Sequence, residues 1–123
     1  MDRKVEIFEV LTPIGIQYLR DIVTELYRFA FSNEVYKASV VDDGLLTFTP
    51  PTAGFGLAMA GDAEEYGLFT FSSAAAITLI ANSANTVNTD TDAKFCIYDT
   101  GTAIGFKNRL AATKDITYWV FWP

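Results

Sequence analysis

The sequence predicts a mainly-β fold: a single-domain antiparallel β-sandwich, or a barrel-like fold, with one amphipathic helix near the N-terminus. Half of the 123 residues are hydrophobic and 15% are aromatic, which is the composition of a chain with a core. Short runs of strand-forming residues alternate with turns rich in Gly, Pro, Asn and Asp. The last run, Ile116–Trp122, has period-two alternation with two mostly apolar faces, so an open solvated face is not expected there.

The N-terminal part is expected to hold a strand or extended arm over residues 1–12 and a helix over 13–31, with its periodic part at about 14–31. Thr12-Pro13 is a helix-start signal, because threonine can cap a helix and proline is tolerated at the first helical position. Apolar residues then recur at helical spacing: Tyr18, Leu19, Ile22, Val23, Leu26, Tyr27 and Ala30. The alternative is extended structure, since Ile, Val, Tyr and Phe also favour strands.

The β-rich body is expected over residues 35–123, as about seven short strands of one domain. Val35–Val41 and Leu45–Thr49 are predicted to form a hairpin around Asp42-Asp43-Gly44, and Thr52–Ala63 a glycine-containing loop. Ser83–Asp92 is predicted to be a polar loop. The other predicted strands are Tyr66–Phe71, Ala75–Asn82, Phe95–Tyr98, Ala103–Lys107 and Ile116–Trp122.

The stretch between Tyr66 and Thr89 contains no charged residue. Exposed strands normally carry charges that block edge-to-edge pairing, so this stretch indicates either burial or a role in assembly. The second face of Ile116–Trp122 raises the same question. It needs a cover from a second layer, from the helix or from another protein.

Six residues are candidate contacts with a partner or another copy. Phe55, Leu57 and Met59 are expected to be exposed in the glycine-rich loop, where they either contact a partner or fold back as a lid on the core. The others are Trp119, Phe121 and Trp122 on the last strand. Of the two tryptophans, one is expected in the core and the other at an interface.

Composition argues against several classes of function. The chain has no histidine, which removes the usual general base and most transition-metal sites, so no enzyme activity and no cofactor are expected. A net charge of −6 without a basic cluster argues against nucleic-acid binding. The single cysteine, Cys96, excludes an intrachain disulfide. No run of about 18 apolar residues predicts a membrane helix, and no signal peptide is expected, which indicates synthesis in a cytoplasm.

Two motifs suggest specific chemistry. Asp99-Thr100-Gly101 matches the active-site triplet of aspartic proteases, in which two chains can each give one aspartate. The same triplet is an ordinary hairpin turn, and too little chain follows it, so a dimeric protease is a remote alternative. A calcium loop is suggested by Asn88, Asp90, Asp92 and Asp99, which stand at positions one, three, five and twelve of the usual spacing, although Ala93 replaces the expected glycine. A solvated loop is the default interpretation.

The C-terminal quarter of the chain carries a resemblance to a known family. Within Gly101–Trp122, the segment Ile104-Gly105-Phe106-Lys107-Asn108-Arg109-Leu110-Ala111-Ala112-Thr113-Lys114 precedes an aromatic strand. This pattern resembles the C-terminal end of small virion proteins of tailed bacteriophages, which have glycine where Ala111 stands.

The resemblance implies a β-rich structural protein located in the virion. A capsid decoration (cement) protein that stabilises the shell is the first expectation, and a tail or fibre component is the second. The implied partners are further copies of the chain, with a trimer favoured, and the major capsid protein or another virion protein, but neither nucleic acid nor membrane. A competing hypothesis from a different class is a carbohydrate-binding β-sandwich that uses surface aromatic residues.

Overall fold

The computed structural model describes residues 21, 32–62 and 64–123. The chain divides into two compact units, Met1–Ser32 and Asn33–Pro123, and the second contains nearly all of the described residues. The predicted arm at 1–12 and the predicted helix at 14–31 lie outside the described residues, except for Asp21, which is helical. The expectation that 1–123 form one domain stays a prediction.

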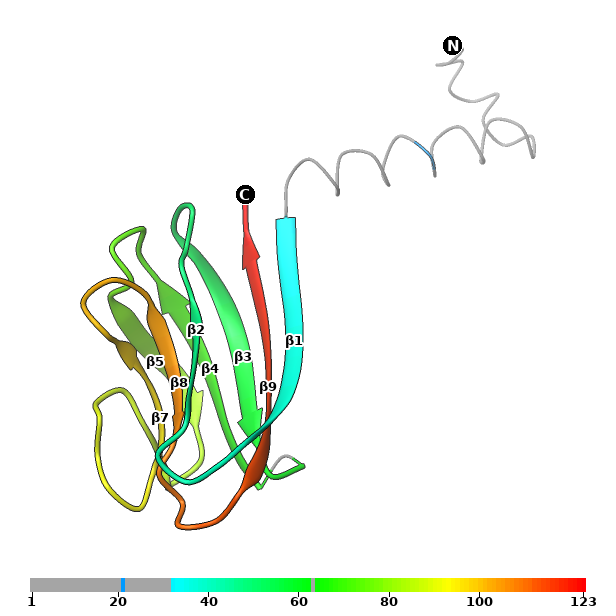
Figure 1. The fold of residues 1–123 in the computed structure, drawn as a ribbon. Helices are drawn as coiled ribbons and strands as arrows, with labels where there is room; N and C mark the ends of the chain where they lie inside the picture. Colours follow the sequence, from blue (N-terminus) through cyan, green and yellow to red (C-terminus); the bar gives the residue numbers. More distant parts are fainter. Residues whose placement is uncertain (1–20, 22–31, 63) are drawn as a thin grey trace, which may run out of the picture. The chain divides into compact units, whose positions relative to one another are not determined.

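The second unit is a β-sandwich of two sheets, which confirms the mainly-β fold class (Figure 1). The described part contains nine strands instead of about seven. The five-stranded sheet has the order β1 (Ser32–Val40), β9 (Lys114–Trp122), β3 (Gly54–Ala60), β4 (Glu65–Phe71) and β5 (Ile77–Asn82). The four-stranded sheet has the order β2 (Leu45–Phe48), β8 (Ile104–Asn108), β7 (Phe95–Asp99) and β6 (Thr86–Val87). The β6–β7 pairing is parallel, whereas β3–β4, β3–β9, β4–β5, β2–β8 and β7–β8 are antiparallel.

The core lies between the two sheets, because alternate residues of each strand point inward. Phe106 of the four-stranded sheet stacks on Tyr118 of the other, with ring centroids 4.5 Å apart and planes 7° apart. Phe69 completes this central group, with its ring 5.9 Å from that of Phe106. The fully buried side chains around them include Phe95, Ile97, Ile104, Ile116 and Val120. These contacts across the layers hold the two sheets together.

The loop predicted for Thr52–Ala63 is wrong, because β3 occupies Gly54–Ala60 at the centre of the five-stranded sheet. The glycines that suggested a loop lie on the buried side of this strand, where space is short. A Cβ atom added to Gly56 would lie 2.7 Å from the ring of Phe69, and one added to Gly54 would lie 2.0 Å from the carbonyl oxygen of Phe121. Glycine here permits close packing inside a strand.

The predicted hairpin of Val35–Val41 with Leu45–Thr49 is also wrong, because β1 and β2 belong to different sheets. The turn between them is fixed to the end of β8 instead. The N–H of Asp43 donates to the carbonyl of Asn108 at 2.6 Å, and the N–H of Asn108 donates to the carbonyl of Gly44 at 3.0 Å. Asp42-Asp43-Gly44 therefore carries the chain from one layer to the other.

The predicted strands Tyr66–Phe71 and Ala75–Asn82 are present as β4 and β5, which pair as a hairpin, and the hairpin turn predicted at Asp99-Thr100-Gly101 joins β7 and β8. Two boundaries shift. Ala75, with a φ of 69°, lies in the turn before β5, and the predicted polar loop at Ser83–Asp92 contains the two-residue strand β6. No helix in the described part of the chain has the length and hydropathy needed to span a membrane.

Candidate functional site

The side of the five-stranded sheet that faces away from the core carries large apolar side chains and hydroxyls. On β3, β4, β5 and β9, alternate residues point to this side because their neighbours fill the core. None of these outward residues over the centre of the sheet is charged. We call this set the outer face: Phe55, Leu57, Met59, Tyr66, Leu68, Thr70, Thr78, Thr117, Trp119 and Phe121.

The register of the strands arranges the outer face in rows. Directly opposite residues in neighbouring strands lie side by side on one face, where they contact one another. The first row ends in a stacked pair, since the rings of Phe55 and Phe121 are 5.1 Å apart with planes at 21°. The three rows are Phe121, Phe55, Thr70 and Thr78; Trp119, Leu57 and Leu68; and Thr117, Met59 and Tyr66.

The outer face is accessible over much of its area. Phe55 and Tyr66 are each 42% exposed and Leu68 is 39% exposed, whereas Phe69, beside Leu68 in the chain, is fully buried. Single exposed apolar residues are common, but adjacent ones form a patch of the kind that marks contact sites. The outer face is therefore a candidate contact surface.

One end of the outer face is bordered by charge. Lys37 on β1 and Asp115 at the start of β9 lie 3.9 Å apart. A hollow of about 270 Å³ opens beside them, lined by Lys37, Met59, Asp62, Asp115, Thr117 and Trp119. This end combines an indole, a hydroxyl, a cation and carboxylates.

The structure brings together five of the six contact residues predicted from the sequence. Phe55, Leu57 and Met59 lie on the outer face with Trp119 and Phe121, on a strand and not in a loop. Trp122 points to the opposite side of β9, where its ring lies 5.4 Å from that of Phe48 at the edge of the core. That these six residues contact a partner stays a prediction.

Tyr66 and Leu68 also belong to this surface, although they are not among the contact residues predicted from the sequence. The alternation in β4 marks them as outward residues, since Gly67, Phe69 and Phe71 are buried. Their position beside Met59 and Leu57 follows from the β3–β4 pairing. That pairing could not be predicted once the β3 segment had been interpreted as a loop.

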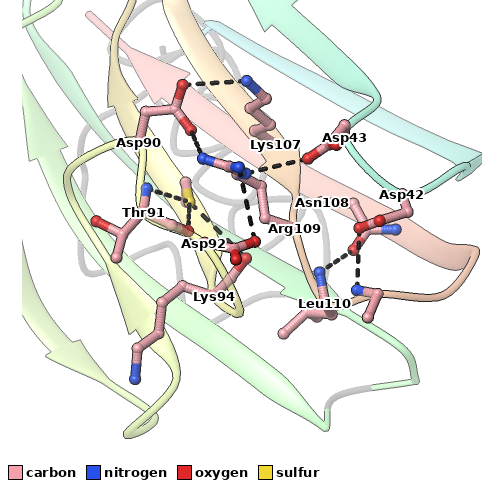
Figure 2. A network of polar contacts seen from close by, with 12 residues as sticks. Asp42, Asp43, Asp90, Thr91, Asp92, Lys94, Lys107, Asn108, Arg109 and Leu110 are labelled. Atoms are coloured by element: carbon pink, nitrogen blue, oxygen red, sulfur yellow. Dashed lines mark hydrogen bonds and ion pairs between the residues drawn. The ribbon is translucent and has the colours of Figure 1, made fainter.

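A second group of polar residues lies at the four-stranded sheet, where Arg109 joins three segments of the chain (Figure 2). Its Nη1 donates to Asp90 Oδ1 at 3.1 Å, its Nε to Asp43 Oδ1 at 3.0 Å, and its Nη2 lies 3.6 Å from Asp92 Oδ1. The other oxygen of Asp90 accepts from Lys107 Nζ at 3.0 Å. The hydrogen bond from Lys107, together with the contact to Arg109, lowers the pKa of Asp90.

This network contains two of the four residues of the calcium-loop hypothesis. Both carboxylate oxygens of Asp90 are engaged by cationic side chains of the protein. Asp92 faces Arg109, and among the described residues no group of three or more His, Cys, Asp or Glu side chains is placed to hold a metal ion. Of the candidate ligands Asn88, Asp90, Asp92 and Asp99, the structure thus pairs Asp90 and Asp92 with cations of the protein and places Asp99 in the turn after β7, and calcium binding stays a prediction.

The Asp99-Thr100-Gly101 triplet forms the turn between β7 and β8. The N–H of Gly101 donates to Asp99 Oδ1 at 2.7 Å, and Gly101 has a φ of 101°. The N–H of Thr100 donates to the carbonyl of Ala103 at 2.9 Å. These are the bonds of a hairpin turn with an aspartate at its start.

Cys96 is fully buried in β7, beside the loop that contains Asp90. Its thiol lies 3.3 Å from the carbonyl of Thr91 and accepts from the N–H of the same residue at 3.4 Å (Figure 2). Burial raises the pKa of this thiol, so it stays protonated near neutrality. It behaves as a small core residue.

No protein-family model matches this chain, and comparisons with curated proteins and with solved structures likewise find no match.

Proposed function

We propose that this protein is a structural component of an assembly, which associates with copies of itself through the outer face of its five-stranded sheet. The observation that carries the proposal is that the ten outward residues over the centre of β9, β3, β4 and β5 are all uncharged, in a chain whose net charge is −6, while Asp115 on β9 brings charge to one end of the face. Depletion of charge and enrichment in aromatic residues distinguish the centre of protein interfaces from the remaining surface. Charges elsewhere on the chain keep it soluble until that face is covered.

The setting that we propose is a bacteriophage particle, with the protein as a decoration protein that stabilises the capsid. Support comes from the C-terminal resemblance, which covers Gly101–Trp122 and hence β8 and β9. β9 supplies Trp119 and Phe121 to the outer face. The segment that resembles virion proteins is thus also a segment that builds the proposed contact surface.

Carbohydrate binding is a second candidate, favoured by the hollow beside Trp119. An indole ring can stack on the apolar face of a sugar, and the Asp62, Asp115 and Thr117 oxygens beside it can accept or exchange hydrogen bonds with hydroxyl groups. A titration with monosaccharides and oligosaccharides, followed by tryptophan fluorescence, tests this function. A saturable change that is lost in Trp119→Ala would support it, and a flat titration would remove it.

Substitution of one outer-face residue tests the leading proposal. Leu68→Asp places a carboxylate in the middle row of the face, where covering it would remove a charge from water at a high cost. Leu45→Asp is the matched control, since Leu45 is similarly exposed, at 44%, but lies on β2 of the other sheet. We expect light scattering to show that Leu68→Asp lowers the mass of the assembly while Leu45→Asp leaves it unchanged. Equal masses for both variants and the unaltered chain would contradict the proposal.

A further inference from the structure

The edge strands of the two sheets differ in how well they are protected against pairing with another chain. β1 carries Glu34 and Lys37, β2 has four residues and is soon followed by Pro50-Pro51, and β6 has two residues. Charge, shortness and proline are the usual means of blocking an edge. β5 (Ile77–Asn82), at the other end of the five-stranded sheet, is six residues long and has neither charge nor proline, so its one protecting feature is a bulge at Ile80.

The register of β5 shows which of its backbone groups point away from the sheet. The N–H of Ser72 donates to the carbonyl of Ala76, so Ser72 and Ala76 form a hydrogen-bonded pair at the start of the β4–β5 hairpin. Hydrogen-bonded pairs alternate with non-bonded ones along an antiparallel ladder. Thr70 and Thr78 are then a bonded pair, while Ile77 and Leu79 direct their N–H and C=O groups to the free edge.

No hydrogen bond from another described residue reaches these outward groups of Ile77 and Leu79. The bulge opposite Leu68 and Phe69 inserts Ile80, which is 59% exposed, and it limits the regular part of the edge to 77–79. These three residues form a short, neutral edge with donors and acceptors in place for one more strand.

We propose that β5 pairs with β5 of a second copy, antiparallel and about a two-fold axis, so that the two five-stranded sheets become one. Identical copies with a net charge of −6 repel one another, and they can approach most closely where neither carries charge. The stretch from Tyr66 to Thr89, which contains β5, is the longest uncharged stretch of the sequence. The free edge of a strand carries both N–H donors and C=O acceptors, so it can pair with an identical edge. A two-fold contact requires this kind of self-complementary surface.

The outward groups fix the register of this contact. Ile77 of one copy faces Leu79 of the other, so that the two residues exchange hydrogen bonds in both directions. Thr78 then faces Thr78 of the second copy as a non-bonded pair, with Cα atoms about 4.5 Å apart. Both Thr78 side chains lie on the outer face, whose first row continues across the axis.

Cysteine cross-linking tests this geometry. Two cysteines at position 78 would meet the distance that a disulfide requires, which is a Cα separation of about 4.4–6.8 Å. Thr70→Cys is the matched control, because it has the same side chain on the same face one strand further in. Across the axis, the two copies of residue 70 would be separated by three strand spacings, roughly 14 Å. The native thiol of Cys96 is buried and takes no part.

Under oxidised glutathione, we expect Thr78→Cys to give a covalent dimer on a non-reducing gel and Thr70→Cys to stay monomeric. A Thr78→Cys chain that does not cross-link, or cross-linking of both variants at the same rate, would overturn the proposal. So would a light-scattering mass that shows the unaltered chain as a monomer or an isolated trimer, because a two-fold contact requires an even number of copies.

A second pair of variants tests this inference separately from the proposed function. The inference rests on the proposed function only in assuming that copies of the chain associate. Thr78→Lys places two lysines opposite each other at the axis, whereas Thr70→Lys adds the same charge away from it. We expect Thr78→Lys to halve the mass. If Leu68→Asp dissociates the assembly but Thr78→Lys and Thr78→Cys behave like the unaltered chain, association through the outer face is supported and pairing through the β5 edge is rejected. The reverse pattern retains the edge contact and removes the proposed function.

Discussion

Phe55 on β3 and Phe121 on the neighbouring strand β9 lie directly opposite each other, with their rings stacked 5.1 Å apart. The pair lies on the side away from the core, and the Phe55 side chain remains 42% exposed. Two aromatic rings on the outer side of a sheet both stabilise the strand pair and present an apolar surface to a partner. The two roles can be separated by measurement.

The first prediction concerns the coupling of these two rings. In a double-mutant cycle with Phe55→Leu and Phe121→Leu, we expect an interaction free energy of about 0.5–1.5 kcal/mol, because leucine keeps the side chain apolar but removes the stacking. Urea unfolding at a protein concentration low enough to keep the chain monomeric measures it. Strictly additive losses would show that the stacking contributes nothing to the fold.

A second prediction addresses the contact between the sheets. Phe106→Ala should lower the free energy of unfolding by about 3–5 kcal/mol, since it empties space against Phe69 and Tyr118. Tyr118→Phe should cost about 1 kcal/mol, because it removes only the hydroxyl that donates to Glu34 Oε2 at 2.5 Å. Urea unfolding compares the two. Similar losses of unfolding free energy for both variants would show that the hydrogen bond, and not the packing of the rings, accounts for the stability of this contact.

The third prediction concerns Asn108, a fully buried polar residue at the junction of the two layers. Its Nδ2 donates to the carbonyls of Val40 at 2.9 Å and Ala112 at 2.7 Å, and its Oδ1 accepts from the N–H of Leu110. Asn108→Asp replaces the donor by an acceptor against two carbonyls. We expect a loss of at least about 2–3 kcal/mol in the free energy of unfolding.

Asn88→Asp provides the control for that substitution, since Asn88 is exposed and the chemical change is the same. It should leave the unfolding free energy almost unaltered. If Asn108→Asp were as mild as Asn88→Asp, the buried amide would not be what joins the ends of β1 and β8.

The fourth prediction is a pH dependence through Asp90. Its pKa is lowered in the folded protein, so its contribution to stability is present above the ordinary aspartate value of 3.8 and is lost as the pH falls below that value. In Asp90→Asn this contribution is absent at every pH. The difference in Tm between the unaltered chain and Asp90→Asn should therefore be largest near neutrality and should shrink in acid.

Addition of calcium checks the same network from another direction. Because Lys107 and Arg109 already engage both oxygens of Asp90, millimolar calcium should leave the Tm of the unaltered chain unchanged. A rise in Tm that chelation reverses would restore the calcium-loop hypothesis. Sodium chloride at equal ionic strength controls for screening.

The sequence was sufficient to predict the fold class, most of the strands and the β7–β8 hairpin, because alternation and turn residues are local signals. Gly101 and Asp99 show this well, since the triplet they bound forms the hairpin turn between β7 and β8. Gly54 and Gly56 show the limit. Glycine is needed at these two positions because Phe121 and Phe69, which are distant in the chain, pack closely against them. Local signals cannot show these contacts, so the two glycines predicted a loop where the structure has a central strand.

The same limit affected the candidate surface. Five of its residues were predicted individually from their apolar character, but their arrangement in rows depends on strand order. Asp43 and Asn108 are a further case. Their hydrogen bond sends the chain from β1 to the opposite layer, and no local signal distinguishes this link from a hairpin.

The central claim is that copies of this chain associate through the outer face. The mass of the purified full chain, measured by light scattering across a concentration series, tests it most directly. The account predicts a mass that rises to a stable multiple of the 13.6 kDa chain as the concentration increases. A mass that stays at that of one chain over the whole series would contradict it.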